Sequence, residues 1–65
     1  MPYISFETGS LNADVKRELI QKLTEVSVEV TGIPKEFFMV SIKEFPDHNV
    51  AVGGRTVAEI KVSQQ

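Results

Sequence analysis

The sequence predicts an α+β fold in which a β-α-β unit is followed by a C-terminal β-hairpin. Three observations favour this fold class. Residues 3–8 and 38–45 alternate between apolar and polar side chains, residues 13–31 repeat apolar side chains at helical spacing, and a Gly-Gly pair separates two short β-prone segments. A helix between two strands predicts parallel pairing with a right-handed crossover. We expect the 65 residues to form one domain, residues 1–65.

The first predicted strand begins directly after Pro2 and covers residues 3–8. Ile4 and Phe6 fall on one face, and the opposite face carries Tyr3, Ser5 and Glu7. This alternation is typical of a strand with one buried face. Residues 9–12 are expected to form a loop that leads into the helix.

An amphipathic helix is predicted over residues 13–31. Asn12 is a suitable N-cap, and Asp14 in the first turn complements the helix dipole. Gly32 is expected to end the helix in a left-handed conformation, and Pro34 prevents its continuation. The apolar stripe of this helix is expected to form the core, and it contains Val15, Leu19, Ile20, Leu23, Val26 and Val30.

The second predicted strand covers residues 38–45. Its helix-facing side chains are Phe38, Val40 and Ile42, and its other face carries Met39, Ser41 and Lys43. Residues 46–49 are expected to form a turn, and residues 50–57 a hairpin around Gly53-Gly54. Residues 58–65 have little pattern and are expected to form a tail.

Composition excludes several classes of protein. The chain has no cysteine, which rules out disulfides and thiolate metal sites, and His48 is its only histidine, so no metal site is expected. A net charge of −2 with scattered basic residues argues against nucleic acid as a partner. No apolar run reaches the ~20 residues of a membrane span. We expect a cytoplasmic protein.

The predicted fold leaves apolar surface uncovered. One helix covers one face of a two-stranded sheet, so both strand edges and the face with Tyr3, Met39 and Phe45 lack a cover. Chains of this size are marginally stable alone, and without disulfides the remaining route to stability is association. The sequence therefore predicts an oligomer.

Pro2 is a candidate general base because it directly follows Met1. Methionine is normally removed ahead of a small residue such as proline, which would leave a secondary amine at the start of the chain. Burial disfavours the cationic form of an amine and lowers its pKa towards neutrality, where a base acts best. The alternative is an ordinary proline that begins a strand, where a missing N–H is tolerated.

The combination of these features resembles the 4-oxalocrotonate tautomerase family. Pro2 opens a strand, a long helix leads to a second strand ending near Lys43-Glu44, and Val52-Gly53-Gly54 follows in the hairpin. The resemblance implies β-α-β subunits that pair into four-stranded dimers and assemble as hexamers. It also implies that the amino-terminal proline moves a proton on enols and α,β-unsaturated ketones, with no metal or organic cofactor.

The chain departs from the family's pattern at the substrate-binding positions. Leu11 and Met39 occupy the positions of two arginines that hold a dicarboxylate in the resembled family, and Val50 occupies an aromatic position. Arg55 and Lys43 are the remaining cations that could bind substrate. Arg55 could equally be a solvated charge of the hairpin, and a lysine placed like Lys43 more often extends to solvent.

Two hypotheses follow from the retained proline and the lost arginines. The first is a cofactor-independent tautomerase or isomerase that acts on a small enol or unsaturated keto acid as a homo-oligomer. The second is a catalytically silent subunit that assembles with a competent partner chain in a hetero-oligomer.

Overall fold

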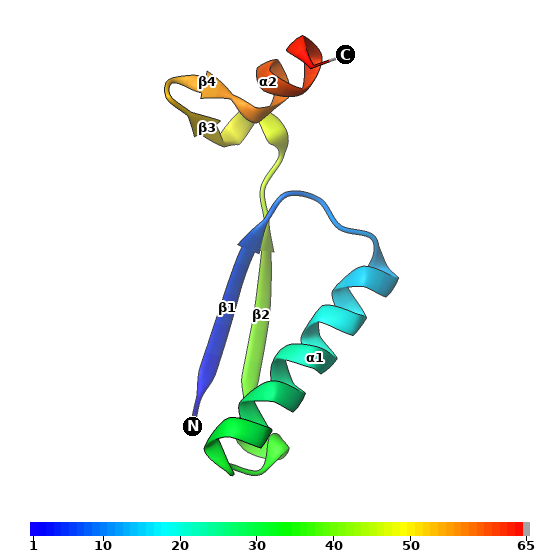
Figure 1. Ribbon diagram of the computed structural model, residues 1–65, viewed down its shortest axis with the longest axis vertical. Helices are drawn as coiled ribbons and strands as arrows, with labels where there is room; N and C mark the ends of the chain where they lie inside the picture. The colour runs from blue at the N-terminus through cyan, green and yellow to red at the C-terminus, as the bar shows by residue number, and fades with distance from the viewer. Residues whose placement is uncertain (65) are drawn as a thin grey trace.

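The computed structural model describes residues 1–64. The elements follow the order β1 (Tyr3–Thr8), α1 (Ala13–Thr31), β2 (Met39–Glu44), β3 (Ala51–Val52), β4 (Arg55–Thr56) and α2 (Val57–Ser63). The chain is elongated, with principal extents of 45 × 23 × 16 Å. Helix α1 lies beside the β1–β2 sheet, and the C-terminal module of β3, β4 and α2 projects beyond the far ends of the two strands (Figure 1).

Strands β1 and β2 pair in parallel, which confirms the predicted β-α-β unit. The register runs from Tyr3 opposite Met39 to Thr8 opposite Glu44. A hydrogen bond extends the ladder at each end: the Met39 N–H donates to the Pro2 carbonyl at 3.0 Å, and the Phe45 N–H donates to the Thr8 carbonyl at 2.9 Å. The two ends of this sheet are therefore fixed by backbone bonds.

Helix α1 has the predicted bounds and both predicted caps. The Asn12 side chain accepts a hydrogen bond from the Val15 N–H at 2.9 Å, which satisfies one of the free donors of the first turn. Gly32 has φ of 74°, a left-handed conformation that suits glycine, and its N–H donates to the Val28 carbonyl. Local sequence signals thus define this helix completely.

The predicted core stripe of α1 is only partly covered, so that prediction was wrong in extent. Leu19 and Leu23 are half-buried, but the side chains of Val15, Val26 and Val30 are 45%, 50% and 79% exposed. A two-stranded sheet places its strands about 5 Å apart, whereas a helix with its side chains is about 10 Å wide. The sheet therefore covers the flank of the stripe near Leu23 and leaves the flank with Val15 and Val26 open. Val30 lies in the last turn of the helix.

Strand β2 begins at Met39, one residue after its predicted start. Residues Lys35–Phe37 form a 3₁₀ turn in which the N–H groups of Phe37 and Phe38 donate to the carbonyls of Pro34 and Lys35, both at 3.1 Å. The first bond to β1 is the one from the Met39 N–H to the Pro2 carbonyl, so the strand starts after this turn. At the other end Phe45 follows the strand and bonds to β1 by its backbone alone.

The predicted hairpin is present, but the predicted tail was wrong because residues Val57–Ser63 form α2. Gly53 and Gly54 have φ of 61° and 83°, as a tight two-residue turn between β3 and β4 requires. Thr56 and Glu59 form a reciprocal capping box that starts the helix. The spacing Thr-x-x-Glu was a signal for this helix in the sequence. Gln65, the end of the predicted tail, lies outside the described residues.

No described residue is fully buried, because the single chain has no closed core. Its accessible surface is 5108 Å², against about 4,100 Å² for a compact monomer of this mass. Its radius of gyration is 15.4 Å, against about 11 Å for a compact chain of this length. The fold therefore exposes far more surface than a stable globular monomer would.

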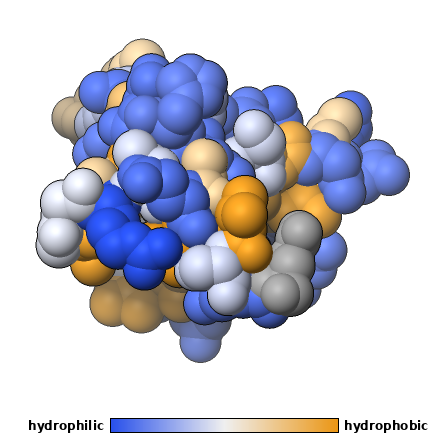
Figure 2. Space-filling model, turned by 90° about the horizontal axis from the view of Figure 1, so that it is seen from above, coloured by the Kyte–Doolittle hydropathy of each residue, from blue (hydrophilic) through white to orange (hydrophobic). Residues whose placement is uncertain are grey.

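Apolar groups reach the surface on several sides of the molecule. Seen from the end formed by the C-terminal module, apolar patches lie between hydrophilic ones (Figure 2), and the side chains of Val52 and Val62 are both more than two-thirds exposed. None of the helices in residues 1–64 has the length and apolar character needed to cross a membrane.

Candidate functional site

Pro2 and Met39 lie together at one end of the sheet. Pro2 is half-buried and precedes β1, and its carbonyl accepts the Met39 N–H at 3.0 Å. Next to them the Tyr3 hydroxyl donates to the Ser41 hydroxyl oxygen at 2.9 Å. While Met1 is attached, the nitrogen of Pro2 is an amide and has no basic lone pair. Its chemistry as a base requires removal of Met1.

A cleft of about 460 Å³ lies at the other end of the sheet, where β1 ends and the C-terminal module begins. Its walls are formed by Glu7, Thr8, Gly9, Phe45, Asn49, Val50 and Ala51. Apolar side chains dominate these walls, and the Thr8 hydroxyl and the Asn49 amide supply neutral polar groups. No lysine or arginine of the described chain lines this cleft, so it offers no cation to an acidic ligand.

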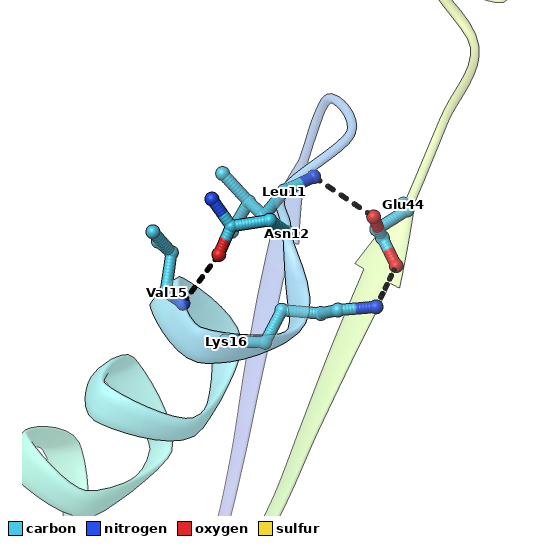
Figure 3. Close-up of polar contacts among 5 residues, drawn as sticks. All are labelled: Leu11, Asn12, Val15, Lys16 and Glu44. Carbon is cyan, nitrogen blue, oxygen red and sulfur yellow. Dashed lines mark hydrogen bonds and ion pairs between the residues drawn. The ribbon is translucent and has the colours of Figure 1, made fainter.

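Leu11 lies beside this end of the sheet, in the loop between β1 and α1, where Glu44 holds it (Figure 3). The Leu11 N–H donates to Glu44 Oε2 at 2.9 Å, and Lys16 Nζ is 2.7 Å from Glu44 Oε1. The hydrogen bonds from Lys16 and from the Leu11 backbone hold the pKa of the Glu44 carboxyl below its ordinary value. Glu44 is therefore ionised at neutral pH.

Neither predicted cation lines the cleft. Arg55 is in β4, and its Nη2 is 3.4 Å from the Ser63 hydroxyl of α2. It lines a separate hollow formed with Ala58, Glu59, Val62 and Ser63. Lys43 is exposed and stands opposite Glu7 in the β1–β2 register. Neither cation is placed beside Pro2 within one chain.

The predicted site residues fall into two groups at opposite ends of the sheet. Pro2 and Met39 form one group, and Leu11 and Val50 lie at the other end. The six residues of β1 span about 20 Å at 3.3 Å per residue, which is too far for one small molecule to touch both groups. A single chain therefore holds only parts of the predicted site.

Sequence reasoning missed the residues that support this site. The Lys16–Glu44 ion pair joins positions 28 residues apart, and no local pattern marks it. The sequence predicts Thr8 and Phe45 in strands and Asn49 in a turn, and only their convergence at the cleft distinguishes them.

Comparison with known proteins extends these observations. Residues 2–60 match the family model described as "Tautomerase enzyme". The chain is 32% identical over 62 residues to the 2-hydroxymuconate tautomerase of Bacillus subtilis, a match that covers 94% of this chain and 100% of that protein. It is 32% identical over 60 residues to a probable tautomerase of Bacillus cereus, covering 91% of this chain and 98% of that one.

Solved structures give the same result for the fold. TomN, a 4-oxalocrotonate tautomerase homologue in the tomaymycin biosynthetic pathway, superposes with a TM-score of 0.93 at 31% identity, covering 98% of this chain and 100% of TomN. A 4-oxalocrotonate tautomerase isozyme from Methylibium petroleiphilum superposes with a TM-score of 0.85 at 28% identity, covering 91% and 97% of the two chains. The predicted tautomerase-like fold is thereby confirmed.

Proposed function

Because the chain belongs to the 4-oxalocrotonate tautomerase family, we propose that it is a cofactor-independent tautomerase whose general base is Pro2 after removal of Met1. The observation that carries this proposal is the family match over residues 2–60, which begins at Pro2 itself. The half-buried position of Pro2 at the start of β1 is in accord with it, since partial burial favours the neutral amine.

The proposed reaction moves one proton within the substrate. The Pro2 amine takes the proton of an enol hydroxyl, and the electrons of that O–H bond form the carbonyl. The double bond shifts along the conjugated chain, and a distant carbon takes the proton back from the prolinium ion. The amine ends as it began, so the cycle consumes no second reactant.

We propose that the active site is completed by a second copy of the chain. Pro2 and Met39 lie about 20 Å from the end that carries Leu11 and Val50. A copy packed in the opposite orientation would bring its Leu11 end beside the Pro2 of the first. The uncovered sheet face, where Tyr3 and Met39 are 58% and 52% exposed, and the open flank of α1 supply apolar surface for such contacts.

The protein is expected to be an obligate oligomer, with four-stranded dimers assembled further into a hexamer as the family resemblance implies. Light scattering at micromolar concentration should give six times the mass of one 7.2 kDa chain. On dilution, loss of the oligomer should coincide with loss of the circular dichroism signal, because a chain without a closed core is not stable alone. A folded species with the mass of one chain would contradict this prediction.

The substrate we propose is a small enol or unsaturated keto acid with at most one carboxylate. Leu11 and Met39 cannot replace the paired hydrogen bonds that a guanidinium makes to a carboxylate. In the described part of the chain the cleft near Val50 adds no cation, and its one charged wall residue is Glu7. A second negative charge on the substrate would therefore lack a partner within one chain.

An assay of protein that begins at Pro2 tests the proposed function directly. The purified chain is mixed with a panel of enols, among them a phenylenolpyruvate-type compound and 2-hydroxymuconate, and ketonisation is followed by ultraviolet absorbance. Catalysis above the buffer rate on at least one enol is the expected result. A rate equal to that of buffer on every member would reject the proposal.

The alternative is a catalytically silent subunit that assembles with a competent partner chain. The apolar residues at positions 11 and 39 favour it, because a scaffold subunit has no need of cations to bind substrate. The same assay separates the two functions, because a silent subunit is inactive on every enol when it is assayed without its partner chain.

A further inference from the structure

The loop between β1 and α1 has few anchors. In the part of the chain that the structure describes, a single hydrogen bond ties residues 9–11 to another segment, the one from the Leu11 N–H to Glu44. Among residues 1–64, Asn12, which ends the loop, forms hydrogen bonds with α1 alone. Gly9 lines the cleft, so the position of this loop sets the shape of one cleft wall.

Both oxygens of Glu44 are occupied. Oε2 accepts the Leu11 N–H at 2.9 Å, and Oε1 accepts a hydrogen bond from Lys16 Nζ at 2.7 Å. An ionised carboxylate has only acceptor sites and can serve two donors at once. In Figure 3, Glu44 at the end of β2 faces both the loop and the first turn of α1. One side chain thus joins three segments.

We infer that Glu44 is a positioning residue, which fixes the loop that carries Leu11 so that Gly9 stays in the wall of the cleft, a wall that we assign to the substrate pocket. The inference rests on the proposed tautomerase function and assigns to Glu44 no contact with the reacting atoms. The bond to the Leu11 backbone is the part that matters for the loop, and the ion pair with Lys16 supports Glu44 from the helix side. The two side chains of the pair are about one-third exposed, so water screens their charges.

Three substitutions in the assembled, Met1-free protein separate the two bonds. Glu44→Ala removes both, Glu44→Gln keeps a carbonyl oxygen for the Leu11 N–H but loses the charge, and Lys16→Met removes only the ion pair. Lys61→Met is the matched control, because it breaks the exposed pair between Lys61 of α2 and Asp47 in the turn before β3, whose atoms are 2.8 Å apart. Steady-state kinetics and hydrogen exchange at the Leu11 amide are measured for each.

We expect Glu44→Ala to raise KM about tenfold or more with little change in kcat, because a displaced wall weakens binding of substrate and transition state alike. Exchange at the Leu11 amide should accelerate in the same variant. Glu44→Gln should keep both the KM and the exchange rate of the Leu11 amide close to those of the parent protein. Lys16→Met and Lys61→Met should stay within about twofold of the parent KM, since an exposed ion pair contributes little.

When the parent protein is active, two results would overturn the inference. One is a Glu44→Ala variant with the parent KM and the parent exchange rate at Leu11. The other is an equal rise of KM in Glu44→Ala, Glu44→Gln and Lys16→Met. That result would assign the effect to the charge of Glu44 and not to its bond with the loop. If the parent protein itself is inactive on every enol, the proposed function fails, and the inferred pocket role of Glu44 fails with it. Faster exchange at the Leu11 amide in Glu44→Ala would then show that Glu44 has only a structural role, which is to hold the loop.

Discussion

Protein that retains Met1 is expected to lose tautomerase activity almost completely. Its Pro2 nitrogen is then part of a peptide bond, where resonance removes the basic lone pair. General base catalysis contributes about 10²–10⁴-fold to a rate, so the Met1-retaining form should be slower by that factor. The fold should be unaffected, because the backbone bond of Pro2 to β2 uses its carbonyl and not its nitrogen.

The comparison needs both forms of the chain at known purity. Intact mass measurement distinguishes them, and thermal unfolding shows whether the fold is retained. Pro2→Ala leaves a more flexible primary amine and should fall between the two forms in kcat. His48→Ala is the control, because His48 is the only histidine and the most obvious alternative base. Full activity in the Met1-retaining form would refute Pro2 as the base.

A second expected result is a strong preference for substrates with one carboxylate over matched dicarboxylates. The resemblance implies that the family holds diacids with two arginines, and we propose that Leu11 and Met39 take those positions here. Leaving a buried charge without its partner costs about 2–5 kcal/mol, which corresponds to tens- to thousands-fold in affinity. The ratio of kcat/KM between a monoacid and a matched diacid should fall in this range.

Substitutions at position 39 and at Arg55 identify the cause of this preference. Met39→Arg should raise kcat/KM for the diacid, because Met39 is next to Pro2 and half exposed, which leaves room for a guanidinium. Met39→Gln, polar but uncharged, is the matched control and should not. Arg55→Ala tests whether a neighbouring subunit supplies a cation that binds the second carboxylate. If the parent protein turns over the diacid efficiently and Arg55→Ala does not change this, the substrate pocket lies elsewhere in the protein.

The sequence by itself determined the elements of this protein, because each rests on interactions between near neighbours along the chain. Asn12 and Gly32 define the ends of α1 through hydrogen bonds to residues three and four positions away. The alternation in residues 3–8 and 38–45 predicted both strands of the sheet, and Gly53-Gly54 predicted the hairpin. Helix α2 was equally open to prediction from the spacing of Thr56 and Glu59.

Only the tertiary structure decided which residues meet. It separated Pro2 from Val50 by the length of β1, and it joined Glu44 to Leu11 and Lys16, which are 33 and 28 residues away in the chain. It also left Val26 and Val30 exposed, although their periodicity matches that of the half-buried Leu23. Periodicity gives the direction of a side chain around its own helix or strand. Whether another element lies in that direction depends on the width of the sheet and the packing of segments distant in sequence.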